Sequence, residues 1–353
     1  VSTDGEVIAA ASVPSTPGER TPGRDREREF VRERTLQMPT FNPPGSVFKP
    51  FVAAYALDRI HYDPASEFTC EPVTPGGTGF YADLHCAGVH HHCNLQRALT
   101  VSCNVYFAHV GECFTNDELA DMTRLFGFGQ PTGVRMFGTE GRGGLVEHSR
   151  LKWNKAVLAA LDGMSGKRRF ANGLTYVEAT PMQVARAMAG IATGRLPELT
   201  LVRSIGGEPV APRGRELGIG ETSLAFVRHA MELVVTDGEG SAHNKGLDAE
   251  KLGFHLAAKT GSGDYAQFER GEAASASDRA DAEENRVRKH TWVAGFFPAE
   301  KPRAVVVVYL HDTSRTSSHT AVYVTAQFLQ TEAVKNWLAR TLEADRKRSE
   351  EAR

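Results

Sequence analysis

The sequence predicts a mixed α/β protein, in which a mainly antiparallel sheet is flanked by helices and joined to a helical subdomain. Two observations predict this class. Apolar segments of strand length gather late in the chain, at residues 254–259, 291–297 and 304–310, whereas helical patterns dominate from residue 46 to about residue 195. Because each element must bury its apolar side, a helix–sheet–helix arrangement is the expected assembly.

The amino-terminal elements are expected to be a strand, a linker and a helix. Val7–Ala11 is a short apolar run of strand length, and residues 14–33 are polar and highly charged, as in a linker. The prolines and glycine at residues 43–45 would end any helix or strand before them. Ser46–Arg59 then carries apolar residues at helical spacing. We therefore expect a largely buried helix that begins at Ser46.

Two later helices and a hairpin complete the expected fold. Thr180 begins a Thr-Pro-Met-Gln sequence, which has the pattern of an N-cap, a first-turn proline and a capping-box partner, and Gly194 is expected to end that helix. The methionine and alanine stripe of this helix is interpreted as core. Residues 298–303 are expected to join the last two strands as a hairpin, and Val322–Leu342 to form one closing amphipathic helix.

Composition limits the function classes. With 353 residues, 41% of them hydrophobic and 24% charged, the chain can bury a large core, and two subdomains that share a cleft fit this length. The formal net charge is −2, so nothing indicates nucleic acid or an anionic membrane surface as a partner. The chain contains no run of 18 apolar residues, so no transmembrane helix is expected within it, and no signal peptide is visible.

Three short motifs carry the candidate chemistry. In chain order they are Ser46-Val47-Phe48-Lys49, Ser102-Cys103-Asn104 and Lys259-Thr260-Gly261. A serine hydroxyl is a weak nucleophile until a base takes its proton, and Ser46 and Lys49 lie three residues apart on one face of the expected helix. Burial lowers the pKa of a lysine, so Lys49 is the candidate general base.

The second motif supplies a hydroxyl and an amide. Ser102 could pass a proton between Lys49 and a leaving group, and Asn104 could hold a substrate peptide bond because an amide both donates and accepts hydrogen bonds. Each motif alone is weak, since Ser-x-x-Lys and Lys-Thr-Gly also occur by chance in chains of this length. Their order and spacing favour a joint catalytic role.

The third motif follows an apolar run of strand length, so it is expected on a strand edge that lines the cleft. There, Lys259 and Thr260 would bind a substrate carboxylate, and Gly261 would let the substrate approach the backbone closely. The backbone N–H groups of Ser46 and Ser262 would form an oxyanion hole.

The motifs and several further segments resemble the transpeptidase domain of high-molecular-weight penicillin-binding proteins. The similar segments are Gly5–Ser12, Phe41–Phe51, Leu125–Gly133, Tyr176–Arg186 and His290–Pro298. The chain departs from the usual pattern at Cys103, where the motif commonly has Asp, and at Ser262, where the family often has Thr. Serine keeps the hydroxyl and the backbone N–H. The segment His90–Leu99 is similar to the elongation-type, class B branch.

This resemblance implies a peptidoglycan D,D-transpeptidase. Ser46 would attack the D-Ala-D-Ala bond of a stem peptide, release the terminal D-alanine and pass the acyl group to an amine on a neighbouring strand, and β-lactams would acylate the same serine. A D,D-carboxypeptidase or a serine β-lactamase is the alternative within the enzyme class. From another class, a β-lactam sensor domain or an inactive cell-wall scaffold is the alternative.

The resemblance also implies a domain organisation and a location. Residues 1–345 would form the transpeptidase domain, with a sheet-containing subdomain from roughly residues 1–60 and 200–345, a helical subdomain from residues 61–199 and a charged tail at residues 346–353. A membrane anchor and an N-terminal domain are expected upstream of this chain, so the domain would work outside the cytoplasmic membrane. Its expected partners are peptidoglycan stem peptides, β-lactam antibiotics and other cell-wall synthesis proteins.

Five cysteines would permit disulfides in such a compartment. Cys70, Cys86 and Cys93 lie in one glycine- and proline-rich stretch, so two of them could pair, while Cys103 and Cys113 follow on an expected helix. One group of possible zinc ligands consists of His85, Cys86, His90, His91, His92 and Cys93. Its spacing matches no known zinc pattern, so neither a metal ion nor another cofactor is expected.

The segment Ala266–Lys289 is rich in Ala, Ser, Asp, Glu and Arg. It is expected to be a long solvated loop between two strands. A charged insertion without a role is the favoured interpretation, and gating of the cleft is the alternative.

Overall fold

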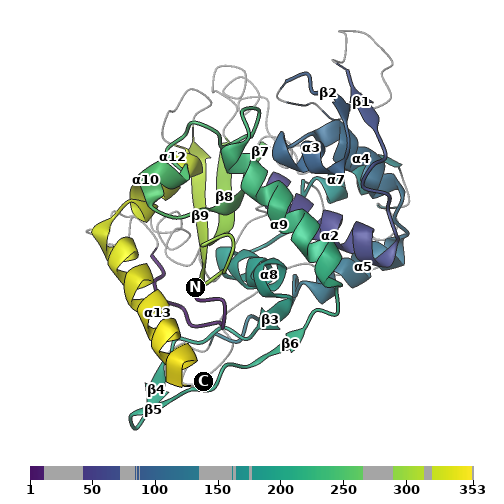
Figure 1. Ribbon diagram of the computed structural model, residues 1–353. Coiled ribbons are helices and arrows are strands. Elements are labelled where there is room, and N and C mark those ends of the chain that lie inside the picture. The colour runs from purple at the N-terminus through teal and green to yellow at the C-terminus, as the bar shows by residue number, and fades with distance from the viewer. Residues whose placement is uncertain are drawn as a thin grey trace, which may run out of the picture.

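A three-stranded antiparallel sheet with helices on both sides forms the centre of the protein (Figure 1). The structure is a computed structural model, and it describes residues 1–11, 43–71, 84, 86, 88–134, 161, 164–174, 177–264, 289–313 and 320–351. The predicted linker at residues 14–33, residue His85 and all but the last residue of the predicted loop at 266–289 lie outside the described residues.

The strands of the central sheet are, in spatial order, β7 (Ala257–Asp264), β8 (Lys289–Phe297) and β9 (Ala304–Thr313). The strands predicted at residues 291–297 and 304–310 and the hairpin between them are confirmed. The strand predicted at residues 254–259 begins later, because pairing with β8 starts where Ala257 lies opposite Phe296. β7 is an edge strand, so one of its sides is open to contacts with the helical part of the chain.

Helices cover both faces of this sheet, as the sequence predicts. On one face lie α2 (Lys49–Arg59), α8 (Pro181–Thr193) and most of α9 (Glu221–Thr236), and on the other lie α10 (Ala249–Leu252), α12 (Ala321–Leu329) and α13 (Glu332–Glu351). Successive residues of β8 alternate between the two faces: Trp292 packs into the first core cluster and Val293 into the second. The core is therefore divided into two layers by the sheet.

The helix predicted from its capping pattern forms where the sequence places it. Thr180 Oγ1 accepts a hydrogen bond from the Gln183 N–H at 3.1 Å, and Gln183 Oε1 accepts one from the Thr180 N–H at 3.1 Å. Gly194 ends α8 in the left-handed region, with φ of 78°. The methionine and alanine stripe of α8 is buried, which confirms its interpretation as core.

A group of short helices lies beside α2 and carries the second motif (Figure 1). It comprises α3 (Leu95–Thr100), α4 (Asn104–Glu112), α5 (Asn116–Leu125) and α7 (Met164–Ala171), together with the hairpin of β1 (Phe68–Cys70) and β2 (His91–Cys93). α4 and α7 approach closely because residue 111 is glycine, where a Cβ atom would lie 2.7 Å from the Lys167 carbonyl oxygen. The predicted division of the chain into two subdomains stays a prediction.

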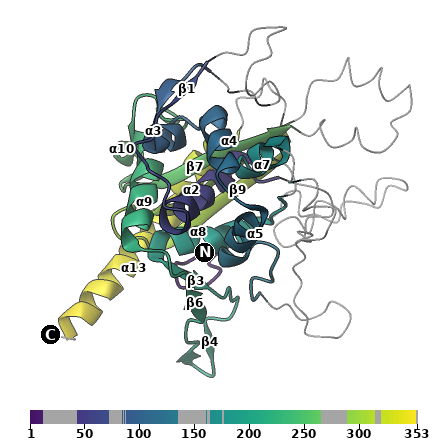
Figure 2. The ribbon, with the colours of Figure 1, turned by 90° about the vertical axis from the view of Figure 1, so that its right-hand side faces the viewer.

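Two small ribbons follow α8. They are β3 (Arg195–Pro197) with β6 (Gly214–Glu216), and β4 (Ser204–Ile205) with β5 (Glu208–Pro209). The β4–β5 hairpin projects from the body of the protein in both views (Figure 1 and Figure 2). None of the described helices combines the length and the apolar character needed to cross a bilayer.

The strand predicted at Val7–Ala11 is wrong. Within the described residues, the amino-terminal segment pairs through two isolated bridges, Ser2 with Ala304 and Glu6 with Thr200. Beyond Val7 the described chain is exposed, and none of the described strands pairs with the apolar run that favoured a strand.

The single closing helix predicted at Val322–Leu342 is also wrong, because the chain forms two helices, α12 and α13. Between them the Thr331 N–H donates to the Phe328 carbonyl at 3.1 Å, and the Gln330 amide donates to the Gly246 carbonyl at 3.0 Å. Both helices bury apolar residues in the same core cluster. The apolar pattern therefore continues across the break, which explains why it resembles that of one helix.

Candidate active site

Ser46 lies in a 3₁₀ turn, η1 (Gly45–Phe48), which leads directly into α2. Gly45 has φ of +57°, and a Cβ atom there would lie 2.5 Å from the Ser262 carbonyl oxygen. The Gly45 N–H also donates to the Gly173 carbonyl at 2.9 Å. Glycine at this position therefore lets the nucleophile turn pack against β7, and the half-buried Ser46 lies where the turn and the strand meet.

Lys49 is fully buried in the first turn of α2 and reaches the second motif. Its Nζ donates to Asn104 Oδ1 at 2.7 Å and to the Ser102 carbonyl at 2.9 Å, and it lies 3.5 Å from Ser102 Oγ. Burial lowers the pKa of Lys49 to about 8. The neutral amine that a general base requires is therefore far more populated near neutral pH than in an ordinary lysine.

Ser102 occupies the turn between α3 and α4 in a left-handed conformation, with φ of 64°. This conformation is unfavourable for a residue with a side chain and is typical of functional sites. The next residue, Cys103, caps α4 by accepting a hydrogen bond from the Tyr106 N–H at 3.4 Å. The cap and the bond from Lys49 hold Ser102 beside the base.

Asn104 is held by a residue that the sequence analysis missed. The buried Asn172 donates from its amide to the Asn104 carbonyl at 3.1 Å and to the Arg168 carbonyl at 2.9 Å. A lone asparagine after a helix is too common in sequences to indicate such a contact. The structure thus adds a supporting amide behind the second motif.

The third motif lies on the edge strand β7, as predicted. Lys259 is fully buried, and its Nζ donates to the Thr260 carbonyl at 3.1 Å. Burial and, to a smaller extent, the positive charge of Lys49 hold the pKa of Lys259 well below its usual value. Thr260 is half-buried and is therefore the more exposed residue of the pair, and its Oγ1 lies 2.7 Å from Ser241 Oγ.

The structure gives a second reason for glycine at position 261. A Cβ atom on Gly261 would lie 2.5 Å from Val47 Cγ2 and 2.8 Å from the Pro44 carbonyl oxygen. The glycine therefore gives room to the nucleophile turn, and the close approach of a substrate at Gly261 stays a prediction. On the same edge, the contact between Gly45 and Ser262 brings the backbones of Ser262 and the nucleophile turn together, and the oxyanion hole of Ser46 and Ser262 stays a prediction.

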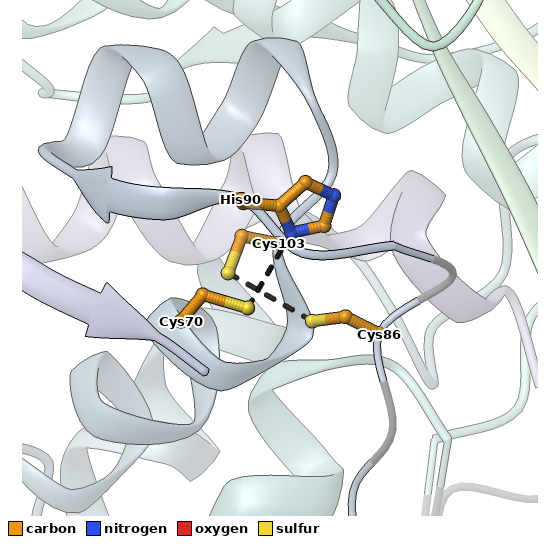
Figure 3. A group of neighbouring side chains, drawn as sticks. All are labelled: Cys70, Cys86, His90 and Cys103. Atoms are coloured by element: carbon orange, nitrogen blue, oxygen red, sulfur yellow. Dashed lines mark hydrogen bonds between the residues drawn. The ribbon is translucent and has the colours of Figure 1, made fainter. Parts of the chain in front are cut away.

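A second cluster of reactive side chains lies directly beside the second motif (Figure 3). The ligand-type atoms of Cys70, Cys86, His90 and Cys103 all lie within 4.8 Å of one another. Cys86 Sγ is 3.8 Å from Cys103 Sγ, and Cys70 Sγ is 3.6 Å from His90 Nδ1. The Asn104 N–H donates to Cys86 Sγ at 3.1 Å, which links this cluster to the motif.

The grouping differs from the histidine-rich set considered in the sequence. His91 and His92 lie exposed on β2. His85 lies outside the described residues, and among the described members of that set Cys86 and His90 join the cluster. Comparison with the sequence spacings of known zinc sites could not find this cluster, because the four donors come from separate segments that meet only in the fold. All five cysteines are free thiols, so the pairing considered among Cys70, Cys86 and Cys93 does not occur in this structure.

The four donors suit one zinc ion, which prefers a tetrahedral set of thiolate and imidazole ligands. A shared hydrogen bond with Cys103 and burial raise the pKa of Cys86 to about 11. A thiol in this environment keeps its proton unless a cation replaces it. The cluster could therefore hold a zinc ion in a structural role beside the Ser-Cys-Asn turn.

Comparisons with known proteins identify the family of the chain. The sequence model of the family described as "Penicillin binding protein transpeptidase domain" matches residues 2–330. The chain is 25% identical over 289 residues to the peptidoglycan D,D-transpeptidase MrdA of Haemophilus influenzae, covering 79% of the chain and 42% of that protein. It is 28% identical over 313 residues to the probable peptidoglycan D,D-transpeptidase PenA of Neisseria gonorrhoeae, covering 87% of the chain and 46% of that protein. The chain thus spans about half the length of the curated relatives it matches.

Solved structures share the fold. The penicillin-binding protein PBP2 of Helicobacter pylori, solved in a complex with MreC, superposes with a TM-score of 0.65 at 20% identity, covering 96% of this chain and 59% of that one. PBP2 of Pseudomonas aeruginosa, in complex with the compound WCK 5153, superposes with a TM-score of 0.63 at 22% identity, covering 86% of this chain and 62% of that one. These likenesses confirm the predicted fold class.

Proposed function

We propose, from the premise that this chain belongs to the penicillin-binding protein transpeptidase family, that it cross-links peptidoglycan stem peptides through an acyl-enzyme on Ser46. One observation carries the proposal. Lys49, one turn after Ser46, reaches both polar members of the second motif with hydrogen bonds of 2.7 and 2.9 Å. This arrangement places an amine of lowered pKa beside the Ser102 hydroxyl, three residues after Ser46, which supports Lys49 as the base, Ser102 as the relay and Ser46 as the nucleophile.

Acylation would proceed in balanced steps. Ser46 Oγ attacks the carbonyl carbon of the D-Ala-D-Ala bond while its proton passes to the neutral amine of Lys49. The C–N bond then breaks, and the leaving D-alanine nitrogen receives a proton through Ser102. Backbone N–H groups of Ser46 and Ser262 would stabilise the negative oxygen of the tetrahedral intermediate. In the second half, an amine of a neighbouring stem peptide attacks the ester, and Ser46 recovers its proton.

A β-lactam would enter the same pathway. Its strained amide takes the place of the scissile peptide bond, and ring opening leaves the nitrogen attached to the acyl group. The leaving group therefore stays in the site and blocks the acceptor amine. This accounts for the expectation that β-lactams inhibit the enzyme by covalent attachment to Ser46.

The relatives favour transpeptidation among the enzyme alternatives. Two curated relatives are named as D,D-transpeptidases or probable D,D-transpeptidases, and the similarity to each extends over more than three quarters of this chain. A D,D-carboxypeptidase or a serine β-lactamase would use the same acylation steps but let water take the acyl group. A sensor domain would acylate without turnover, and an inactive scaffold would not acylate.

The location and partners are proposed on the same basis. Stem peptides lie outside the cytoplasmic membrane, so the domain would work there, held by an anchor outside this chain. The relative from H. pylori was solved with MreC, and we propose that this chain likewise works beside other cell-wall synthesis proteins.

Product analysis tests the proposed reaction. The protein is incubated with a pentapeptide stem that ends in D-Ala-D-Ala, with and without an amine acceptor such as D-amino acid or a second stem peptide. We expect D-alanine release together with an acyl-transfer product whose yield rises with acceptor concentration. Hydrolysed tetrapeptide as the only product at every acceptor concentration would favour the carboxypeptidase alternative.

A further inference from the structure

Ser241 lies in the turn that follows α9, far in the sequence from the three motifs. The turn is held by its own backbone and side chains: Asp237 Oδ1 accepts a hydrogen bond from the Glu239 N–H at 2.8 Å. At Gly240 a Cβ atom would lie 2.4 Å from the Val234 carbonyl oxygen, so only glycine lets the turn fold back onto the end of α9. The backbone of the turn therefore sets the position of Ser241.

From this position Ser241 contacts both walls of the candidate site. Its N–H donates to the Thr100 carbonyl at 3.2 Å, two residues before Ser102. Its Oγ lies 2.7 Å from Thr260 Oγ1 on β7. One residue outside the motifs thus connects the segment that carries the second motif with the strand that carries the third.

Two further contacts fix the same turn, and the first of them joins it to α3. Arg97 on α3 donates through both terminal guanidinium nitrogens to the carboxylate of Glu239, with 2.9 Å between Nη2 and Oε1. Lys245 Nζ donates to the Ser241 carbonyl at 2.6 Å. The ion pair is partly exposed, so its own contribution to stability is small, but it fixes the turn beside the second motif.

Which of the two hydroxyls donates the hydrogen bond between Ser241 and Thr260 affects how Thr260 can bind a substrate. A hydroxyl carries one proton and two lone pairs. If Ser241 donates its proton to Thr260 Oγ1, the Thr260 proton is free to point away from Ser241 and donate to a carboxylate in the site. A fully buried Lys259 of lowered pKa presents less charge to that carboxylate, which makes the orientation of Thr260 more important.

We infer that Ser241 is a positioning residue. It orients the Thr260 hydroxyl toward the substrate carboxylate and holds Thr260 at a fixed position relative to the turn that carries Ser102. The inference rests on the proposed function and deepens it, because it assigns carboxylate recognition to a Ser241–Thr260 hydroxyl pair. Ser241 acts through Thr260 and takes no part in the transfer of the acyl group.

The test measures Ser46 acylation by a β-lactam and by its carboxylate methyl ester, with intact mass as the readout. Wild type should discriminate against the ester. Ser241→Ala should lower the ratio of the acylation rates with acid and ester roughly three- to tenfold, which is the effect of losing one neutral hydrogen bond. Ser241→Thr keeps the hydroxyl and should therefore have a ratio close to that of wild type. Thr260→Val should lower the ratio further, and adding Ser241→Ala to it should have no additional effect. Ser204→Ala, an exposed serine on β4, is the matched control and should match wild type.

Each outcome is decisive. An unchanged ratio in Ser241→Ala, an equal loss of rate with acid and ester, or an additional loss in the double variant would overturn the inference while leaving the proposed function intact. The pattern stated above would support it. Absence of any acylation in wild type would overturn the proposed function and this inference together.

Discussion

Lys49 Nζ and Asn104 Oδ1 are 2.7 Å apart, although 55 residues separate them in the chain. The contact joins α2, which follows the candidate nucleophile Ser46, to the turn that carries the second motif. Because the lysine is fully buried, the amide and the Ser102 carbonyl replace the water that an exposed ammonium would bind. The position of the candidate base is therefore fixed by the second motif.

The rate of acylation should depend on the protonation of Lys49. Burial lowers its pKa to about 8, and the reacting form is the neutral amine, so acylation should rise as pH increases through this value. About a tenth of the amine is neutral one pH unit below the pKa and about nine tenths one unit above it. Stopped-flow acylation by a chromogenic β-lactam between pH 6 and 10 measures the profile. A midpoint above pH 10 would mean that Lys49 keeps an ordinary pKa.

Replacing Lys49 separates its roles. Lys49→Met should abolish acylation while leaving the fold, because methionine fills a similar volume without a base. Lys49→Arg should also fail, since a guanidinium does not lose its proton near neutral pH. Circular dichroism checks the fold of both variants. If the Lys49→Arg variant were acylated at the wild-type rate, another group would have to take the proton from Ser46.

Gly261 should be intolerant of a side chain. Gly261→Ala puts a Cβ atom 2.5 Å from Val47 Cγ2 and 2.8 Å from the Pro44 carbonyl, so the nucleophile turn must shift. Such overpacking typically costs about 1–3 kcal/mol, and we expect a lower melting temperature together with acylation slowed at least tenfold. Gly88→Ala is the control, because a Cβ there meets no atom within 4 Å. If the two variants had the same melting temperature and the same acylation rate, η1 and β7 could not be packed as described.

The Cys70, Cys86, His90 and Cys103 cluster should retain about one zinc ion per chain when the protein is purified under reducing conditions without chelators. Removing the ion with a strong chelator should lower the melting temperature and slow acylation, because Cys103 and the Asn104 N–H belong to the Ser-Cys-Asn turn. Elemental analysis and thermal unfolding are the measurements.

The exposed Cys113 supplies the matched control for this cluster. Cys86→Ser should lose zinc and stability, whereas Cys113→Ser should keep both. If the protein contained no zinc and still had normal stability and a normal acylation rate, the cluster would have no metal role.

Local signals in the sequence were reliable where a few adjacent residues determine the structure. The capping pattern at Thr180 and the glycine at position 194 set both ends of α8, since each acts within one helical turn. The buried helix predicted from Ser46 also forms, but its α-helical part begins at Lys49, because Gly45–Phe48 form a 3₁₀ turn before it. The strands β8 and β9 were predicted because they are long, apolar and joined by a short connection.

The features that sequence reasoning missed depend on distant segments. A strand at Val7–Ala11 would need a partner, which the described fold does not provide there. Ser241 and Asn172 carry no local signal, because their contacts are set by turns and helices far from them in the chain. The cysteine and histidine cluster forms only when β1, the turn before α4 and the chain between them meet, so a spacing pattern could not find it.

The central claim is that Ser46 is the acylated nucleophile, and the intact mass of the protein after incubation with a labelled penicillin tests it most directly. We expect wild type to gain the mass of one penicillin, peptide mapping to place the adduct on Ser46, and Ser46→Ala to gain none while keeping the wild-type melting temperature. An adduct on a different serine, or an adduct of equal yield in Ser46→Ala, would contradict the account.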